Sequence, residues 1–176
     1  MKKMKMILAT MLSVVVVLGG VIPVNAASSE VTFEVMETDT NVGVTVPSQM
    51  PIVFNEDGTN TYPKNWKITN DSNVAGVYLS KMTFAPNNGW TLLGEEEQAR
   101  YNPANTKSVR FFIGTEDVMN EVVPTQGVGV VNYSDYEIAM PAGTSQVIKM
   151  NVERGAFTER INTQKSFDIE LNFEFI

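Results

Sequence analysis

The C-terminal part of the chain alternates strictly between large apolar and polar residues. Phe167, Ile169, Leu171, Phe173 and Phe175 are apolar, and the residues between them are Asp, Glu or Asn. Successive side chains of a β-strand point to opposite faces, whereas a helix would spread this pattern around its axis. A strand with one apolar face needs a second layer of structure to cover that face. The alternation therefore predicts a strand with one buried and one wet face.

Short segments of the same kind fill the rest of the chain. Val31–Met36 and Val42–Val46 alternate, and the turn Asn55–Gly58 ends in the Asp-Gly pair that is typical of tight hairpins. Roughly nine or ten such segments are separated by Gly, Pro and Asn turns. We therefore expect an all-β fold, a two-layer antiparallel β-sandwich. Its topology is either Ig-like or jelly-roll.

The first residues, Met1–Ala26, have the pattern of an export signal. Three lysines precede the apolar run Met11–Ile22, Pro23 breaks that run, and small residues stand at positions 24 and 26. Cleavage after Ala26 would leave residues 27–176, the length of a single domain. The sequence thus predicts a signal peptide followed by one β-sandwich domain. We expect the protein to be secreted, either into the medium or onto the cell wall.

The composition of the rest of the chain bears on membrane anchoring and on nucleic-acid binding. The chain has no cysteine for lipid attachment, no second long apolar run and no sorting motif, so we expect no permanent membrane anchor. Without the signal, 10 basic residues stand against 20 acidic ones, a net charge of −10. Because such a chain has no basic stretch to neutralise phosphates, we expect no nucleic-acid partner.

Histidine is absent as well as cysteine. This excludes Ser-His-Asp and Cys-His arrangements and the usual zinc ligand sets. The acidic residues show no spacing that singles out a catalytic pair. Asn55–Asn60 has the oxygen-rich character of a calcium loop, but a hairpin turn is the simpler explanation. We therefore expect a protein that is not an enzyme and has no catalytic residues, no cofactor and no metal.

Two features remain as candidate contact surfaces. Trp90 and Tyr101 are candidate ligand-binding aromatics that would stack on sugars; for Trp90, which opens a strand at a turn, core packing is the better explanation. The terminal strands are the second feature, because a strand edge can pair with another copy of the chain. The alternative is that both strands pair within their own sheet.

Several turns and strands occur in a familiar order along the chain. They are Val44–Pro47, Pro51–Val53, Asn55–Thr59, Lys67–Ser72 and Asn88–Leu92. This order resembles that of uncharacterised small exported β-sandwich proteins of Firmicutes.

Within this group, Trp90-Thr91-Leu92 is similar to the first motif of the WxL cell-wall-binding domains. The second motif of those domains would fall near residues 170–174, where the chain has no Trp. The resemblance implies a structural or adhesive protein at a Gram-positive cell surface. The alternative is a carbohydrate or cell-wall (WxL-like) binding module. The expected partners are a cell-wall glycan, another surface protein or a second copy of the chain.

Overall fold

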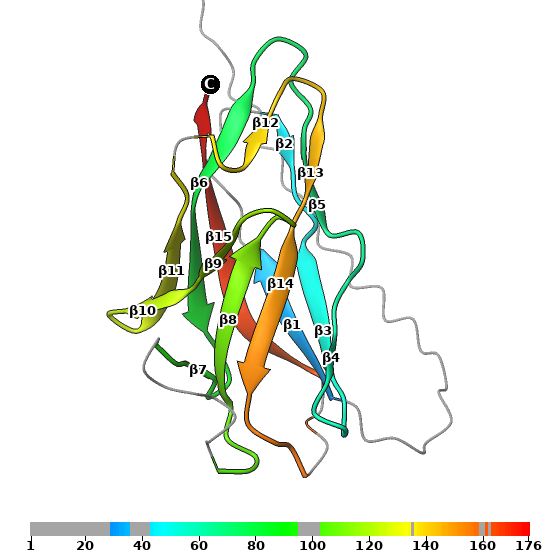
Figure 1. The fold of residues 1–176 in the computed structure, drawn as a ribbon, viewed down its shortest axis with the longest axis vertical. Coiled ribbons are helices and arrows are strands. Elements are labelled where there is room, and N and C mark those ends of the chain that lie inside the picture. The colour runs from blue at the N-terminus through cyan, green and yellow to red at the C-terminus, as the bar shows by residue number, and fades with distance from the viewer. Residues whose placement is uncertain (1–28, 36–42, 95–102, 135, 159–160, 162) are drawn as a thin grey trace, which may run out of the picture.

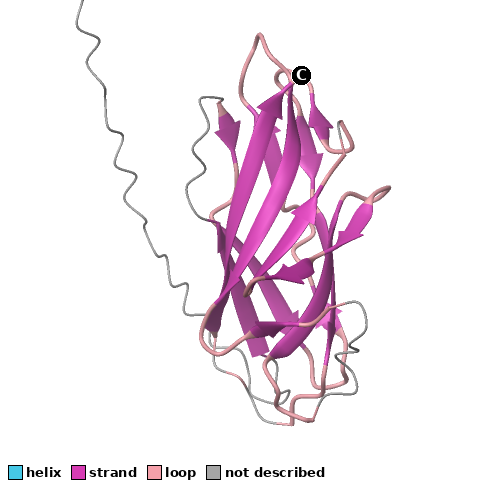
Figure 2. Cartoon of the chain, turned by 90° about the vertical axis from the view of Figure 1, so that its left-hand side faces the viewer, coloured by secondary structure: helices cyan, strands magenta, loops and turns pink. Residues whose placement is uncertain are grey.

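The computed structural model describes residues 29–35, 43–94, 103–134, 136–158, 161 and 163–176. These residues form β-strands joined by turns and loops, with no helix among them (Figure 2). Accordingly, no described segment is a helix of the length and apolarity that a membrane span requires. The predicted all-β fold is confirmed.

The first layer is one large sheet, which we call the first sheet (Figure 1). β15 (Gln164–Phe175) and β6 (Val77–Pro86) are its longest strands and pair antiparallel. β12 (Ala139–Met140) also pairs with β6. Beyond β6 the sheet continues with β11 (Val128–Asn132) and then β10 (Val123–Thr125). Beyond β15 it continues with β1 (Ser29–Val35), β3 (Gln49–Phe54) and β4 (Asn60–Thr61).

The second layer consists of two smaller sheets, which are connected where β13 (Ser145–Val147) of one is followed directly by β14 (Lys149–Arg154) of the other. One holds β13, β5 (Lys67–Asn70) and β2 (Val44–Thr45). The other holds β14, β8 (Ser108–Gly114), β7 (Thr91–Leu92) and β9 (Met119–Glu121). Ile148 links β13 to β14, and its backbone N–H donates to the carbonyl of Trp66 at 2.9 Å. Both small sheets therefore belong to one face of the sandwich.

Aromatic rings from both layers meet in the core. Phe33 of β1 stacks on Phe167 of β15 with ring centroids 4.9 Å apart, and both contact Phe111 of the opposite layer edge-on. Phe84 of β6 also lies against Phe111, at 4.8 Å. Aromatic pairs in such geometries stabilise a core beyond the area that they bury. The layers are thus joined by a compact set of phenylalanines.

Both terminal strands pair within the first sheet. β1 lies between β15, which runs parallel to it, and β3, which runs antiparallel. β15 lies between β1 and β6. Of the two alternatives for these strands, internal pairing is the one observed.

The C-terminal strand is longer and less uniformly buried than its alternation predicts. It begins at Gln164, and its buried side chains end at Leu171. Phe173 is half-buried and Phe175 is 58% exposed, so the prediction of burial is wrong for Phe175. The pairing with β6 shifts register between Asn172 and Phe173, where β15 runs on towards the end of the sandwich. The prediction of a hairpin at Asn55–Gly58 is confirmed, since the turn joins β3 to β4 and Gly58 has a φ of 86°.

Candidate functional site

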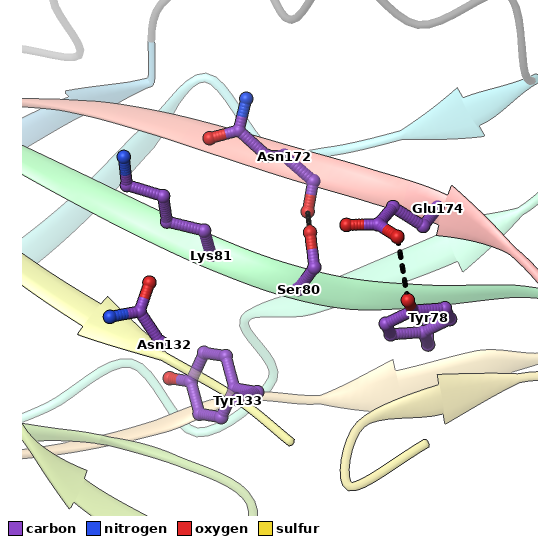
Figure 3. A pocket seen from close by; sticks show the side chains of 7 residues that line it. All are labelled: Tyr78, Ser80, Lys81, Asn132, Tyr133, Asn172 and Glu174. Carbon is purple, nitrogen blue, oxygen red and sulfur yellow. Dashed lines mark hydrogen bonds between the residues drawn. The ribbon is translucent and has the colours of Figure 1, made fainter. Parts of the chain in front are cut away.

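A polar groove of about 540 Å³ lies on the outer face of the first sheet (Figure 3). Strand alternation creates it, because Leu79, Met82 and Leu171 fill the inner face of β6 and β15 and leave polar residues outside. β6, β11 and β15, with the residue after β11, supply the lining, which is Tyr78, Ser80, Lys81, Asn132, Tyr133, Asn172 and Glu174.

The middle of the groove is a row of three polar side chains across three strands. Lys81 pairs in register with Asn132 of β11 on one side and with Asn172 of β15 on the other. Directly opposed residues have Cβ atoms about 4.5–5.5 Å apart. No hydrogen bond or ion pair joins these three side chains to the described part of the chain. We call Asn132, Lys81 and Asn172 the polar row.

Internal hydrogen bonds fix the residues around the polar row. The Tyr78 hydroxyl donates to Glu174 Oε2 at 2.7 Å, and the Ser80 hydroxyl donates to the backbone carbonyl of Asn172 at 3.2 Å. Tyr133 also lines the groove, but its buried hydroxyl points into the core and donates to the carbonyl of Ile113 in the opposite layer at 3.0 Å. Burial raises the pKa of Tyr133, with a further contribution from the charge of Glu137. The residues around the polar row therefore have partners within the protein, whereas the three side chains of the polar row have none among the described residues.

An exposed aromatic ring stands next to the groove. Tyr136 packs against Tyr78 with ring centroids 5.3 Å apart, and Tyr136 is 56% exposed. Its backbone φ of 69° is rare for a bulky residue and costs about 1–3 kcal/mol. Tyr136 lies within the turn that Ser134 and Glu137 close: the Glu137 N–H donates to the Ser134 carbonyl at 3.1 Å, and the Glu137 carboxylate accepts the N–H of Ser134 at 3.0 Å. That hydrogen bonding lowers the pKa of Glu137.

The chemistry of the groove suits binding rather than bond cleavage. An ammonium and two carboxamides offer donors and acceptors without using up one another. Glu174 is the one carboxylate among the described lining residues, and it accepts the Tyr78 hydrogen bond. Glycoside cleavage by acid–base chemistry needs two carboxyl groups across the substrate. Hydroxyl- and amide-rich ligands are the class that these groups would recognise.

The structure places neither predicted aromatic in the groove. Trp90 is 3% exposed and packs against Phe54 and Phe157, so its ring is not available for stacking on a sugar. For Trp90, core packing is therefore the alternative that the structure supports. Tyr101 lies outside the described residues.

The oxygen-rich turn at Asn55–Asn60 uses its oxygens within the protein. Asp57 Oδ1 accepts the N–H of Thr59 at 2.9 Å and its hydroxyl at 2.6 Å, which lowers the pKa of Asp57. Arg154 Nη2 donates to the carbonyls of Asn55 and Thr59 at 2.9 and 3.1 Å. In the part of the chain that the structure describes, no three acidic residues gather as metal ligands would.

Sequence reasoning missed the polar row and Tyr136. The polar half of the C-terminal alternation was the one available signal, because Asn172 and Glu174 belong to it. Comparison of the chain with protein-family models, with curated proteins and with solved structures finds no match.

Proposed function

We propose that this protein is a secreted or cell-surface-associated, non-catalytic structural or adhesive β-sandwich protein of a Gram-positive bacterium. The observation that supports this proposal is the polar row, three side chains in register that have no partner among the described residues. A rigid sheet holds them at fixed spacing, so a ligand would bind without first ordering a loop. The export pattern of Met1–Ala26 and the lack of histidine and cysteine agree with this role.

Co-sedimentation with Gram-positive cells and with purified cell walls tests the adhesive role. We expect the wild-type protein to pellet with one of these surfaces and the K81A/N132A/N172A variant to stay in the supernatant. A matched control, K64A/N65A/N73A, removes the same groups from exposed positions elsewhere and should bind like the wild type. Equal binding by both variants, or no binding by the wild type, would overturn the proposal.

A carbohydrate or cell-wall binding module is the second candidate, and Tyr136 is the observation that favours it. The carboxamides of the polar row match sugar hydroxyls, and an exposed aromatic ring offers an apolar face for the C–H side of a sugar. In this arrangement Tyr136 supplies the stacking ring that was predicted at Trp90.

Protease treatment of the cell walls before the binding assay distinguishes binding to a glycan from binding to a surface protein. Glycan recognition predicts that protease-treated walls retain binding and that Tyr136→Ala weakens it. Loss of binding after protease, with no effect of Tyr136→Ala, would assign the groove to a protein partner instead.

A further inference from the structure

The first and the last described strands lie side by side and run in the same direction. β1 pairs with the first half of β15, from Val31 opposite Gln164 to Val35 opposite Ile169. We propose that this pair is a mechanical clamp that carries tension applied between the start of β1 and the end of β15. This inference goes beyond the proposed function, because it depends on topology and not on the groove or its ligand.

Because β1 and β15 are parallel, the start of β1 and the end of β15 lie at opposite ends of the pair. β15 continues from Gln164 to Phe175, and at about 3.3 Å per residue this distance is roughly 35 Å. Figure 1 shows β15 ending at the top beside the C mark, while β1 begins in the lower part of the sandwich. A pull on the start of β1 and the end of β15 is therefore directed along both strands.

The direction of the pull decides how the hydrogen bonds break. The ladder between β1 and β15 has one irregularity, a register shift between Thr32 and Phe33. A pull along the two parallel strands loads the slanted bonds on both sides of this shift together, so that they must fail together. A pull applied to the same end of both strands loads one bond at a time, and the pair opens like a zip. Opposite-end loading should therefore resist a much larger force with the same set of contacts.

Side chains on both faces of the pair oppose sliding. On the inner face, Phe33 and Phe167 are directly opposite in register and stacked, with their rings 12° from parallel. On the outer face, Lys165 Nζ bonds to Glu34 Oε2 of the neighbouring strand at 2.9 Å and also to Asp168. Any slip of β1 along β15 breaks the ring stack and the cross-strand ion pair at once.

The strands on either side prevent the clamp from peeling away from the sheet. β3 covers β1 from Ser29 to Glu34, and β6 covers β15 from Phe167 to Phe175. Four neighbouring strands thus share the load.

Single-molecule force spectroscopy tests the clamp, and the lack of cysteine makes the attachment points unambiguous. One variant, E30C/F175C, is pulled at opposite ends of the pair. Its matched control, E30C/T163C, keeps the same point on β1 and moves the second point to the start of β15; all three positions are exposed. Forced unfolding is governed by the unfolding rate, and we expect the opposite-end pair to unfold at about twice the force or more at equal loading rate.

A third variant adds Lys165→Gln to E30C/F175C and removes the ion pair with Glu34. We expect a lower opposite-end unfolding force and little change in chemical denaturation, because ion pairs that remain accessible to solvent contribute little at equilibrium. Equal forces for the two pulling directions would overturn the clamp. That result would leave the wall-binding result standing, so failure of the clamp and failure of the adhesive role are distinguishable.

Discussion

The inner and outer faces of β6 and β15 behave in opposite ways although they belong to the same strands. On the inner face, Phe84, Phe167 and Ile169 are fully buried among other apolar side chains. On the outer face, Lys81 and Asn172 stand in register beside Asn132 with no partner among the described residues. The inner face holds the layers together, whereas the outer face has binding capacity that folding does not use.

Polar groups follow the same division. Inside, the Tyr133 hydroxyl and the guanidinium of Arg154 are each hydrogen-bonded, as most buried polar groups are. Outside, the polar row is left to water or to a ligand. Substitutions at matched positions on the two faces should therefore separate stability from binding.

Phe167→Ala should have the largest effect on stability. It removes a fully buried ring that contacts Phe33 and Phe111, and such truncations cost about 3–5 kcal/mol. Urea denaturation followed by tryptophan fluorescence measures the loss. Asn172→Ala on the outer face of the same strand is the control and should change the free energy of unfolding by less than about 0.5 kcal/mol. Similar losses for both would contradict the division of faces.

Arg154→Met should cost less, about 2 kcal/mol, because it removes charge-assisted hydrogen bonds. Arg154 Nε donates to Asn60 Oδ1 at 2.8 Å, and the guanidinium lies over the ring of Phe54 at 4.7 Å. Loss of this side chain removes one of the two donors to each of the Asn55 and Thr59 carbonyls, which keep only their backbone N–H partners. Lys81→Met, the same change for a cation on the outer face, should leave the denaturation midpoint nearly unchanged. An equal shift for the two variants would break the comparison.

Tyr133→Phe should cost about 1 kcal/mol, the usual contribution of one hydrogen bond, here to the carbonyl of Ile113. It should also change the pH dependence. Burial raises the pKa of Tyr133 in the folded state, so the unfolded chain loses its proton first, near pH 10. The stability from neutral Tyr133 is thus complete below about pH 10 and falls as the pH rises further. Denaturation at about pH 8 and pH 11 should show a smaller alkaline loss for the variant; an identical loss would exclude this role of Tyr133.

The K81A/N132A/N172A variant should have the smallest effect on stability. Each side chain lacks a protein partner among the described residues, so the summed change should stay within about 1 kcal/mol. Thermal unfolding of the wild type, this variant and K64A/N65A/N73A measures it. A large loss for the groove variant would show that the polar row supports the fold.

The sequence predicted the features that local pattern determines. The alternation at Phe167–Phe175 identified β15, and Asp-Gly at 57–58 identified the hairpin after β3. The short strands β4, β9 and β10 escaped prediction, because strands of two or three residues depend on their neighbours more than on their own residues.

The polar row could not be predicted from the sequence. Asn132, Lys81 and Asn172 are far apart along the chain, and long-range packing alone decides that β11, β6 and β15 are adjacent. Trp90 illustrates an ambiguity of residue type. Tryptophan serves both as a core anchor and as a sugar-binding surface, and composition does not distinguish the two roles.

The most direct test of the outer face is a nuclear magnetic resonance titration of the ¹⁵N-labelled protein with soluble cell-wall glycan fragments. The side-chain amides of Asn132 and Asn172 give signals at the polar row, and their exposure makes them sensitive to a bound ligand. We predict that these two signals shift first and that amides on the inner face of β6 and β15 stay in place. Saturating shifts confined to another surface, or none at all for the glycan fragments and for extracts of cell-surface protein, would contradict the account.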